Sequence, residues 1–176
     1  MEEMMFSSKL VPQSPRQFEL VQIKAQLASE LNLEWHSRLP IIHWSNIVRN
    51  KHYACYGAMF DWQYFAVGIW SSPVSRSFDD KSVLELRRLA ISDACPKFTA
   101  TWMIGKMVKD ITKNIPEIDR LISYQDMDVH TGTIYKAANW KMTYAKKYAG
   151  GWDKSRIRLA SQSTANKARW EYEIRR

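Results

Sequence analysis

LISYQDMDVHTGTIYKAANW, residues 121–140, joins the pattern of a buried strand to that of a short helix through a polar loop. Residues 121–124 are an apolar and aromatic run typical of a buried strand, and residues 132–139 predict a helix of under three turns. Open α/β sheets bind their ligands at the carboxyl ends of strands. The stretch therefore predicts an α/β fold with a functional site at this junction.

The strand and the loop concentrate side chains that move protons or form hydrogen bonds. They are Ser123, Tyr124, Asp126, His130, Thr131 and Thr133. Asp126 or His130 is a candidate general base, and the serine and the threonines are candidates to hold or orient a substrate. The alternative interpretation is that Asp128 or Thr131 caps the helix and that His130 is a solvated loop residue.

Length and composition predict one soluble domain. The chain has 176 residues, of which 45% are hydrophobic, and this is enough for one core. We expect an extended lead-in at residues 1–16 and a single domain at residues 17–176. The sequence shows neither a membrane-spanning run nor a signal peptide, which predicts a cytosolic protein. Cys55 and Cys95 lie far apart and outside any CxxC motif, which argues against a disulfide framework and a cysteine-bound zinc.

The chain is basic, with 26 Lys and Arg against 18 Asp and Glu and a formal charge of +8. This excess favours a polyanionic partner or a phosphate-bearing cofactor. Positive residues crowd residues 136–176 and alternate with aromatic ones, namely Trp140, Tyr144, Tyr148, Trp152, Trp170 and Tyr172. Such interleaving is typical of nucleic-acid binding. It is equally typical of strands whose rings pack on a sheet while the lysines face water.

Hydrophobic periodicity predicts the other elements. Strands are expected at residues 18–23, 53–60, 64–70, 83–91, 121–124, 140–148 and 168–174, with a hairpin turn at 61–63 and a final turn at Gly150 and Gly151. Helices are expected at residues 24–35 and 45–50, and a longer one begins with Thr99 or Thr101 as N-cap and ends at Pro116. This order predicts a mixed sheet of about six to seven strands flanked by helices.

The segment IYKAANW, residues 134–140, resembles the closing helix of the GNAT N-acyltransferase family, and the order of elements resembles that fold. The resemblance implies that Tyr135 is the general acid that protonates the thiolate leaving group of an acyl thioester. A phenol suits this task because it donates a proton to a basic leaving group without carrying charge itself. Alternatively, Tyr135 is a packed ring with a bonded hydroxyl.

Further segments resemble the Mom-like DNA-modification proteins of bacteriophages, a divergent GNAT branch. They are LELRRL at 84–89, LISY at 121–124 with Asp126, HTGTIYKAANW at 130–140, KARWEYEI at 167–174 and, more weakly, His43-Trp44-Ser45. That family acts on adenine in DNA and converts its exocyclic amine to a carbamoylmethyl or methylcarbamoyl form that blocks restriction enzymes. The resemblance implies a DNA-binding acyltransferase, located in the cytoplasm of a bacterial host if it is phage-encoded.

The resemblance also implies which residues meet the substrates. The catalytic candidates are Ser123, Tyr124, Asp126, His130 and Tyr135, and the substrate-binding candidates are His43, Trp44, Ser45, Thr131, Thr133, Lys136 and Asn139. An adenine in a duplex must leave the base stack before an enzyme reaches it. His43, Trp44 and Tyr124 are the candidates to line its pocket.

One departure from the GNAT pattern concerns the acyl donor. The glycine-rich turn that cradles the coenzyme A pyrophosphate is replaced by CPKFTAT, residues 95–101, which contains no glycine. The amides of a helix N-terminus still favour an anion, and Lys97, Thr99 and Thr101 lie beside them in the sequence. The expected donor is therefore acetyl-CoA or another activated acyl carrier, such as an aminoacyl-tRNA.

Several alternatives remain. His43, Asp126 and His130 form a mixed oxygen and nitrogen metal site in a less favoured interpretation, because their spacing matches no diagnostic motif such as HExxH. Glu85 is either a second base or, as we favour, a salt-bridge partner of Arg87 or Arg88. The rival functions are an ordinary GNAT acetyltransferase that acts on a protein or small amine, and a catalytically inert nucleic-acid-binding protein with this fold.

Overall fold

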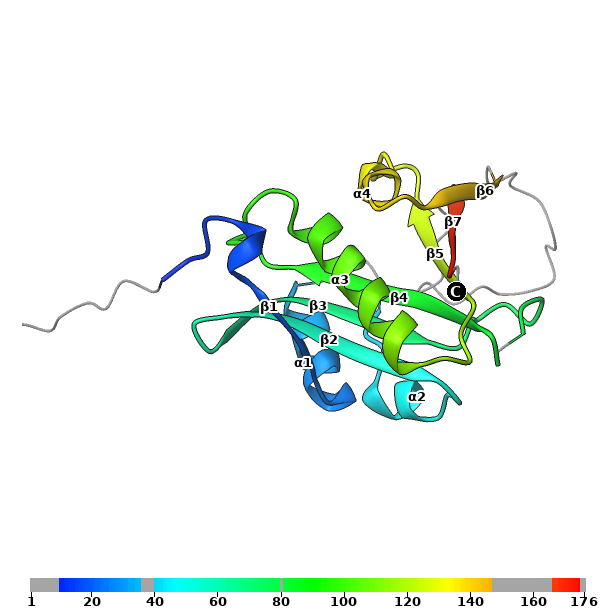
Figure 1. The fold of residues 1–176 in the computed structure, drawn as a ribbon, viewed down its shortest axis with the longest axis horizontal. Coiled ribbons are helices and arrows are strands. Elements are labelled where there is room, and N and C mark those ends of the chain that lie inside the picture. The colour runs from blue at the N-terminus through cyan, green and yellow to red at the C-terminus, as the bar shows by residue number, and fades with distance from the viewer. Residues whose placement is uncertain (1–9, 36–39, 80, 147–165, 175–176) are drawn as a thin grey trace, which may run out of the picture.

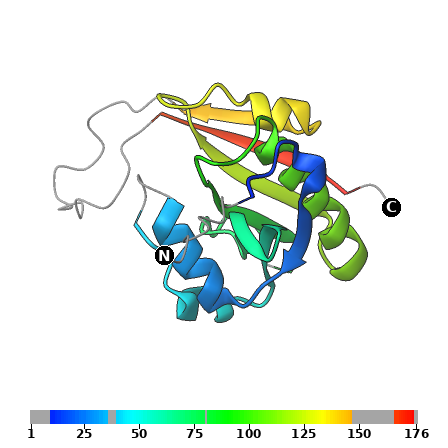
Figure 2. The same cartoon turned by 90° about the vertical axis from the view of Figure 1, so that its left-hand side faces the viewer.

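The computed structural model describes residues 10–35, 40–79, 81–146 and 166–174. They form one seven-stranded mixed sheet with helices on both faces (Figures 1 and 2). In their order across the sheet, the strands are β1 (Glu19–Gln22), β2 (Tyr53–Phe60), β3 (Gln63–Ser71), β4 (Val83–Ile91), β5 (Arg120–Asp126), β7 (Lys167–Glu173) and β6 (Lys141–Lys146). The β4–β5 pair is parallel and the other pairs are antiparallel. The predicted fold class is thus confirmed.

Helices cover the two faces in pairs. In chain order they are the 3-10 helix η1 (Pro15–Gln17), α1 (Ala25–Trp35), α2 (Trp44–Val48), α3 (Thr99–Asn114) and α4 (Thr133–Ala137). Helices α1 and α2 lie on one face of the sheet, whereas α3 and α4 lie on the other (Figure 2). None of the helices within the described ranges is both long and apolar enough to cross a membrane.

Each face of the sheet has its own apolar core. On the α1 and α2 face the buried residues include Ala28, Leu31, Ile47, Cys55, Val67, Ile69 and Ala90. On the α3 and α4 face they include Trp70, Leu84, Leu86, Met103, Met107, Ile111, Leu121, Tyr135, Trp140 and Trp170. Helix α3 buries one side because its apolar residues recur at three- and four-residue spacing. Gly68 of β3 lets it pack closely, since a Cβ there would overlap the Met107 sulfur.

Two local predictions needed correction, one about a hairpin turn and one about a helix N-cap. The β2–β3 turn has only Asp61 and Trp62 at its centre, both with positive φ, and β3 already starts at Gln63. The N-cap of α3 is Phe98, which has a left-handed φ of 70° and makes no side-chain cap bond. The prediction that Thr99 or Thr101 caps this helix was therefore wrong.

The C-terminal strands pack their rings as a sheet would. Trp140 and Trp170 are buried in the α3 and α4 core, while Tyr144 on β6 is 47% exposed. The predicted turn at Gly150 and Gly151 lies outside the described residues, as does most of the basic segment between β6 and β7. Sheet packing therefore accounts for the two buried tryptophans, and nucleic-acid binding by the basic segment stays a prediction.

Candidate active site

Strands β4 and β5 pair over only part of their length. Four residue pairs join them, the last being Leu86 with Ser123, and beyond it β4 continues along β3 while β5 continues along β7 (Figure 1). A register shift accompanies this divergence, because Trp70 pairs with Leu86 and Ile69 pairs with Arg88. Such a bulge bends and twists a strand. We call the point at Leu86 and Ser123 the strand fork.

Ser123 and Tyr135 meet at the strand fork. The Ser123 Oγ lies 2.8 Å from the Tyr135 hydroxyl and donates to the Leu86 carbonyl oxygen at 3.3 Å. A serine hydroxyl has one proton, so both contacts are satisfied when Tyr135 donates to Ser123. Burial raises the pKa of Tyr135, against a smaller lowering by the Ser123 bond. The phenol is therefore neutral and carries a proton, as a general acid must.

Aromatic packing fixes the ring of Tyr135. The ring stacks on Trp170 with centroids 5.4 Å apart, and Trp140 lies 5.7 Å away. The Trp170 indole N–H donates to the Gln125 side-chain oxygen at 2.7 Å, and the Gln125 amide donates to the His130 carbonyl oxygen. This chain of contacts ties the loop after β5 to the ring. Sequence reasoning did not place Gln125 and Trp170 in the site, and a glutamine next to the candidates Tyr124 and Asp126 was the one usable signal.

Gly132 is required by this packing for two reasons. Its φ of 73° suits glycine, and a Cβ there would lie 2.6 Å from the Gln125 side-chain oxygen and overlap Trp170. Gly132 is also the N-cap of α4, without a side-chain cap bond. The interpretation that Asp128 or Thr131 caps this helix was therefore wrong.

Carboxylates shape the loop that follows β5. The Asp126 side chain accepts a bond from the Asp128 amide at 3.0 Å, and the Asp128 carboxylate accepts from the Asn166 backbone and side-chain nitrogens. His130 is exposed, as its interpretation as a solvated loop residue predicts. The candidates on α4 and beside it are exposed as well, namely Thr131, Thr133, Lys136 and Asn139. The two threonine hydroxyls lie 2.7 Å apart, and Asn139 follows α4 with a left-handed φ of 62°.

Tyr124 faces the opposite side of the sheet from Ser123. Ser123 and Gln125 bond to Tyr135 and Trp170 on the α3 and α4 face, and neighbouring residues of a strand point to opposite faces. Tyr124 therefore lies on the α1 and α2 face. Asp126 is two residues further along β5 and so points to the same face. The catalytic candidates are thus divided between the two faces, which the sequence alone did not indicate.

A basic and aromatic cluster surrounds Tyr124. Arg169 of β7 lies opposite Tyr124 in the β5–β7 ladder, and the Arg169 Nε donates to the Glu171 carboxylate at 2.7 Å. The Arg169 guanidinium also lies 5.0 Å from the ring centroid of Phe78 and 5.6 Å from that of Tyr144. Burial raises the pKa of Tyr124, and a hydrogen bond with Arg169 lowers it by less. Arg169 therefore holds the phenol in place while leaving it neutral.

Glu85 of β4 pairs with Arg87 rather than with Arg88. Its carboxylate accepts from the Val74 amide at 2.9 Å and lies 3.5 Å from the Arg87 Nε. Burial raises the pKa of Glu85, and the Val74 bond and Arg87 oppose this rise. The geometry agrees with the structural pairing that we favoured. The raised pKa is the property that a base at this position would need.

Arg88 links β4 to the segment that precedes α2. Its guanidinium donates to the carbonyl oxygens of Arg87 at 2.7 Å and Pro40 at 2.9 Å. Its Nε is buried and has no hydrogen-bond partner among the described residues. Burial, with Arg87 nearby, lowers the pKa of Arg88 to about 10, so the side chain is still a cation at neutral pH. An arginine that is held in place with a free donor can receive an anionic or carbonyl oxygen.

His43, Trp44 and Ser45 lie together at the start of α2. His43 is the N-cap of this helix, and its Nδ1 accepts from the Ser45 amide at 3.3 Å and lies 2.8 Å from the Ser45 Oγ. Because Nδ1 accepts the amide proton, the Ser45 hydroxyl donates to it too. Trp44 is 42% exposed beside the His43 ring. This trio lies on the α1 and α2 face, so the structure does not bring it together with the substrate-binding candidates on and beside α4.

The alternative metal site is not formed. Within the described ranges, which include His43, Asp126 and His130, no three His, Cys, Asp or Glu side chains are placed to hold a metal ion. Asp126 instead supports the loop, and His43 caps α2.

Comparison with known proteins assigns the family. The model of the Mom protein family matches residues 18–174. The chain belongs to the Mom protein family. No curated protein matches it.

Solved structures show that this Mom family member has the GNAT fold. Arabidopsis thaliana NAA60 in complex with acetyl-CoA superposes with a TM-score of 0.64 at 10% identity, over 89% of this chain and 98% of that one. A GNAT acetyltransferase from Streptococcus pneumoniae gives 0.61 at 7% identity, over 89% and 99%. A Bacillus subtilis acetyltransferase in complex with CoA gives 0.57 at 12% identity, over 90% and 98%. Identities this low establish the shared fold alone.

The start of α3 is where this Mom family member departs from the glycine-turn pattern. Thr99 is buried, and its hydroxyl donates to the Pro96 carbonyl oxygen at 2.7 Å, so it is already engaged. Thr101 is half-buried and Lys97 is exposed. The first amides of a helix have no partners within it. Lys97, Thr99 and Thr101 stay predicted ligands of a phosphate-bearing donor, together with the first amides of the helix, and the Thr99 hydroxyl already donates to Pro96.

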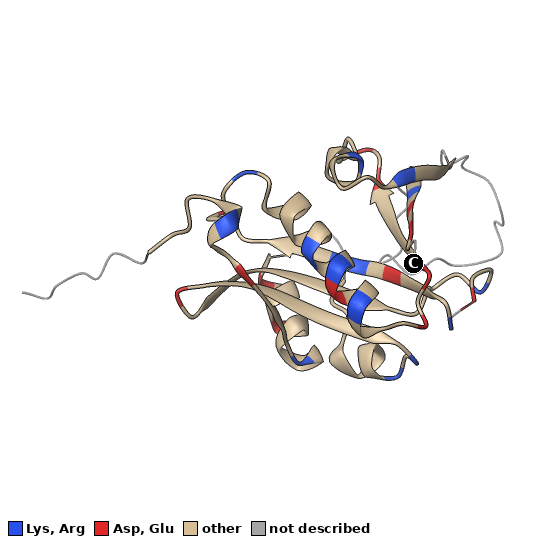
Figure 3. Ribbon diagram, in the orientation of Figure 1, with Lys and Arg blue, Asp and Glu red and all other residues tan. Residues whose placement is uncertain are grey.

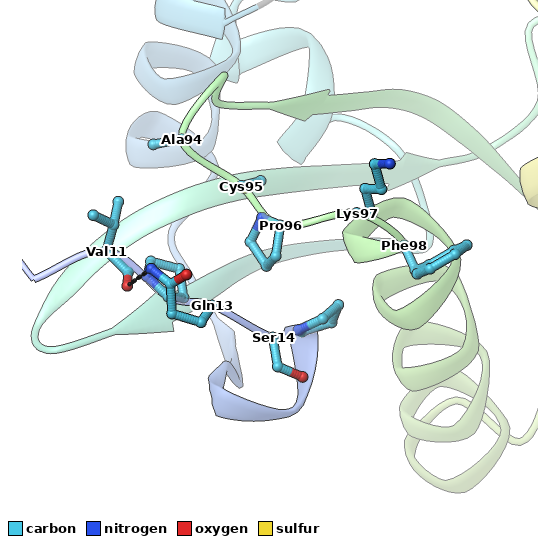
Figure 4. A pocket seen from close by; sticks show the side chains of 10 residues that line it. Val11, Gln13, Ser14, Ala94, Cys95, Pro96, Lys97 and Phe98 are labelled. Carbon is cyan, nitrogen blue, oxygen red and sulfur yellow. Dashed lines mark hydrogen bonds between the residues drawn. The ribbon is translucent and has the colours of Figure 1, made fainter.

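A pocket of about 630 Å³ lies between this loop and the N-terminal segment (Figure 4). Its lining includes Val11, Gln13, Cys95, Lys97 and Phe98. Burial raises the pKa of the Cys95 thiol to about 11, so this cysteine is not a thiolate at neutral pH. Covalent carriage of an acyl group on Cys95 is accordingly disfavoured.

Proposed function

We propose that this protein modifies the exocyclic N6 amine of adenine in DNA by an acyl-transfer-type reaction and so protects the DNA from restriction. The match to the Mom protein family over residues 18–174 carries the proposal. The strand fork supports it, because a protonated phenol and a hydroxyl meet there on a GNAT fold. Of the two products that the resemblance implies, acyl transfer leads directly to the methylcarbamoyl form, in which N6 is bonded to a carbonyl carbon. The carbamoylmethyl form joins N6 to a methylene carbon and would need a further step.

The chemistry needs three kinds of group. The N6 amine is a weak nucleophile, so a base must take its proton while its nitrogen bonds to the activated carbon of the donor. Donors must stabilise negative charge on the carbonyl oxygen, and an acid must protonate the leaving group as its bond breaks. We assign the acid role to Tyr135, because its phenol is neutral and hydrogen-bonded at the strand fork. A phosphate-bearing donor at the start of α3 supplies the activated carbonyl when it binds.

The acceptor base would approach from the α1 and α2 face. This face carries Tyr124 and the exposed rings of His43 and Trp44, and aromatic rings are what a flipped base stacks against. Asp126 shares the strand parity of Tyr124, whereas His130 is exposed on the loop beyond it. We therefore favour Asp126 over His130 as the base for the N6 proton.

Mass spectrometry of nucleosides tests the proposal directly. DNA from bacteria that express the wild-type protein should contain a modified adenine, and DNA from cells that express Tyr135→Phe should contain much less. Tyr53→Phe is the matched control, because Tyr53 is 43% exposed at the start of β2, away from the fork. Unmodified adenine in cells that contain folded wild-type protein would refute the proposed function. Full activity of Tyr135→Phe would refute only the acid role.

A further inference from the structure

Helix α3 carries a row of lysines on its exposed side. Lys106, Lys109 and Lys113 recur at helical spacing after Trp102, and all three are exposed. Among the described residues none of them forms an ion pair, and the Lys106 ammonium lies 6.0 Å from the Trp102 ring centroid. Figure 3 shows the blue turns along α3. We call these three lysines the lysine stripe.

The only carboxylate of α3 does not neutralise the stripe. Asp110 is turned toward the sheet, where it accepts bonds from Tyr56 at 2.8 Å and Gln22 at 3.0 Å, and it accepts another from Asn114 at 2.9 Å. These bonds come from neutral groups and leave the charge of Asp110 in place, so α3 carries the three lysines of the stripe against one carboxylate. The stripe is therefore a net positive surface, and such a surface favours a polyanion.

The stripe extends well beyond the start of α3. At 1.5 Å per residue, Lys106 lies about 10 Å and Lys113 about 21 Å along the axis from Thr99. The phosphates of coenzyme A belong to one nucleotide, and Lys97 and the first amides of the helix suffice to hold them. Lysines spread over about two helical turns instead suit a polymer with a phosphate on every residue.

Gly105 points to close approach on this side of the helix. It is half-exposed in the middle of α3, and a Cβ added there would meet nothing within 4 Å. Glycine weakens a helix relative to alanine, and no packing in the described structure requires it here. A ligand backbone that lies against α3 would use the space that an alanine side chain would fill.

We propose that the lysine stripe binds the phosphate backbone of an RNA that carries the acyl group to the strand fork. The inference rests on the proposed acyl-transfer function, and the placement of the two substrates favours RNA over DNA. The candidates to line the adenine pocket, His43, Trp44 and Tyr124, lie on the α1 and α2 face, whereas the stripe lies on α3, the helix whose start carries the candidate donor groups. If DNA presents its adenine to the α1 and α2 face of the sheet, the α3 and α4 face is left for the RNA that carries the acyl group.

The reaction then joins the adenine N6 to the acyl carbon of an ester on the RNA terminal ribose. The carbon–oxygen ester bond breaks, the ribose hydroxyl takes up a proton, and the N6 proton passes to the base. The products are acylated adenine and a deacylated RNA, and no oxidant or reductant is required.

Binding measurements with neutralised lysines test the stripe. The variant Lys106→Gln/Lys109→Gln/Lys113→Gln is compared with Lys24→Gln/Lys51→Gln/Lys81→Gln, which removes the same charge from three exposed lysines in loops away from α3. Fluorescence anisotropy is recorded with labelled bacterial tRNA and with a labelled adenine-containing DNA duplex over a series of salt concentrations. Thermal unfolding confirms that both variants are folded.

We expect the stripe variant to lose at least about tenfold in tRNA affinity, with a salt slope lower by about 2, while its DNA affinity matches that of the control variant. A parallel loss of DNA affinity would overturn the proposal by making the stripe a DNA surface. Unchanged tRNA affinity would overturn it as well.

A second experiment identifies the donor itself. Modification of added DNA is followed in an extract of bacteria that express the protein, after treatment with ribonuclease or after removal of small molecules by desalting. Ribonuclease should abolish modification and desalting should not, and the reverse result would overturn the RNA donor. If no modified adenine forms in untreated extract or in cells, the proposed function fails, whereas stripe-dependent tRNA binding is judged on its own measurement.

Discussion

Two glycine-to-alanine changes should have opposite effects on stability. Gly132→Ala puts a Cβ on a backbone with φ of 73° and 2.6 Å from the Gln125 side-chain oxygen. A left-handed backbone costs an L residue roughly 1–2 kcal/mol, and overpacking a filled site typically adds about 1–3 kcal/mol. We therefore expect Gly132→Ala to lower the free energy of unfolding by about 2–5 kcal/mol.

Gly105→Ala is the matched control, since it makes the same chemical change where a Cβ meets nothing within 4 Å. Gly105 lies within α3, so alanine should raise the free energy of unfolding by about 0.5–1 kcal/mol. Urea unfolding followed by circular dichroism measures both variants, and the slope with urea should not change. A Gly132→Ala protein as stable as the wild type would refute the packing of Trp170 and Gln125 described at the strand fork.

Three further predictions concern polar groups that are buried or half-buried. Ser123→Ala leaves the Tyr135 hydroxyl and the Leu86 carbonyl without their shared partner, so urea unfolding should show a loss of about 1–3 kcal/mol, and an unchanged stability would contradict this hydrogen-bond chain. Burial raises the folded-state pKa of Glu85 above its unfolded value, so its contribution to stability is fully present below the unfolded pKa and is lost as pH rises through the folded pKa. Wild type should therefore lose stability relative to Glu85→Gln over that rise, and unfolding curves at several pH values that run parallel for the two proteins would contradict this. Burial raises the pKa of Cys95 to about 11, so this thiol should react with iodoacetamide at pH 8 at least roughly tenfold more slowly than an unperturbed thiol, and mass-spectrometric labelling of the folded protein would reveal a faster reaction.

The sequence predicted the elements well because their patterns are local. Residues 121–124 form the core of β5, the amphipathic spacing of α3 ends before Pro116 as expected, and the hairpin of β2 and β3 is present. Each of these follows from the order of apolar and polar side chains within a few residues. The N-caps at Phe98 and Gly132 broke the local rules, because tertiary packing rather than a side-chain cap determines the backbone there.

The division of the candidate site could not be predicted from the sequence. Ser123 and Tyr124 are neighbours in β5 and so point to opposite faces of the sheet. Which of them faces α4 and which faces α2 depends on the register of β5 against β4 and β7. The register shift in β4 at Arg87 depends on how this strand pairs with β3, and no motif in LELRRLAI reveals it. Gln125 and Trp170 are 45 residues apart, so their hydrogen bond is a property of the folded sheet.

The short β4–β5 ladder has a mechanical consequence. Strands β1 to β4 form one half of the sheet, and strands β5, β7 and β6 form the other. The two halves are joined by only four residue pairs between β4 and β5, from Val83 with Arg120 to Leu86 with Ser123. The apolar core on the α3 and α4 face spans this seam, because the ring centroid of Trp70 of β3 lies 6.2 Å from that of Trp140 and Leu84 of β4 packs in the same cluster as Leu121 of β5. Side-chain packing more than hydrogen bonding therefore holds the two halves of the sheet together, and a cavity-forming substitution in this core should loosen the seam.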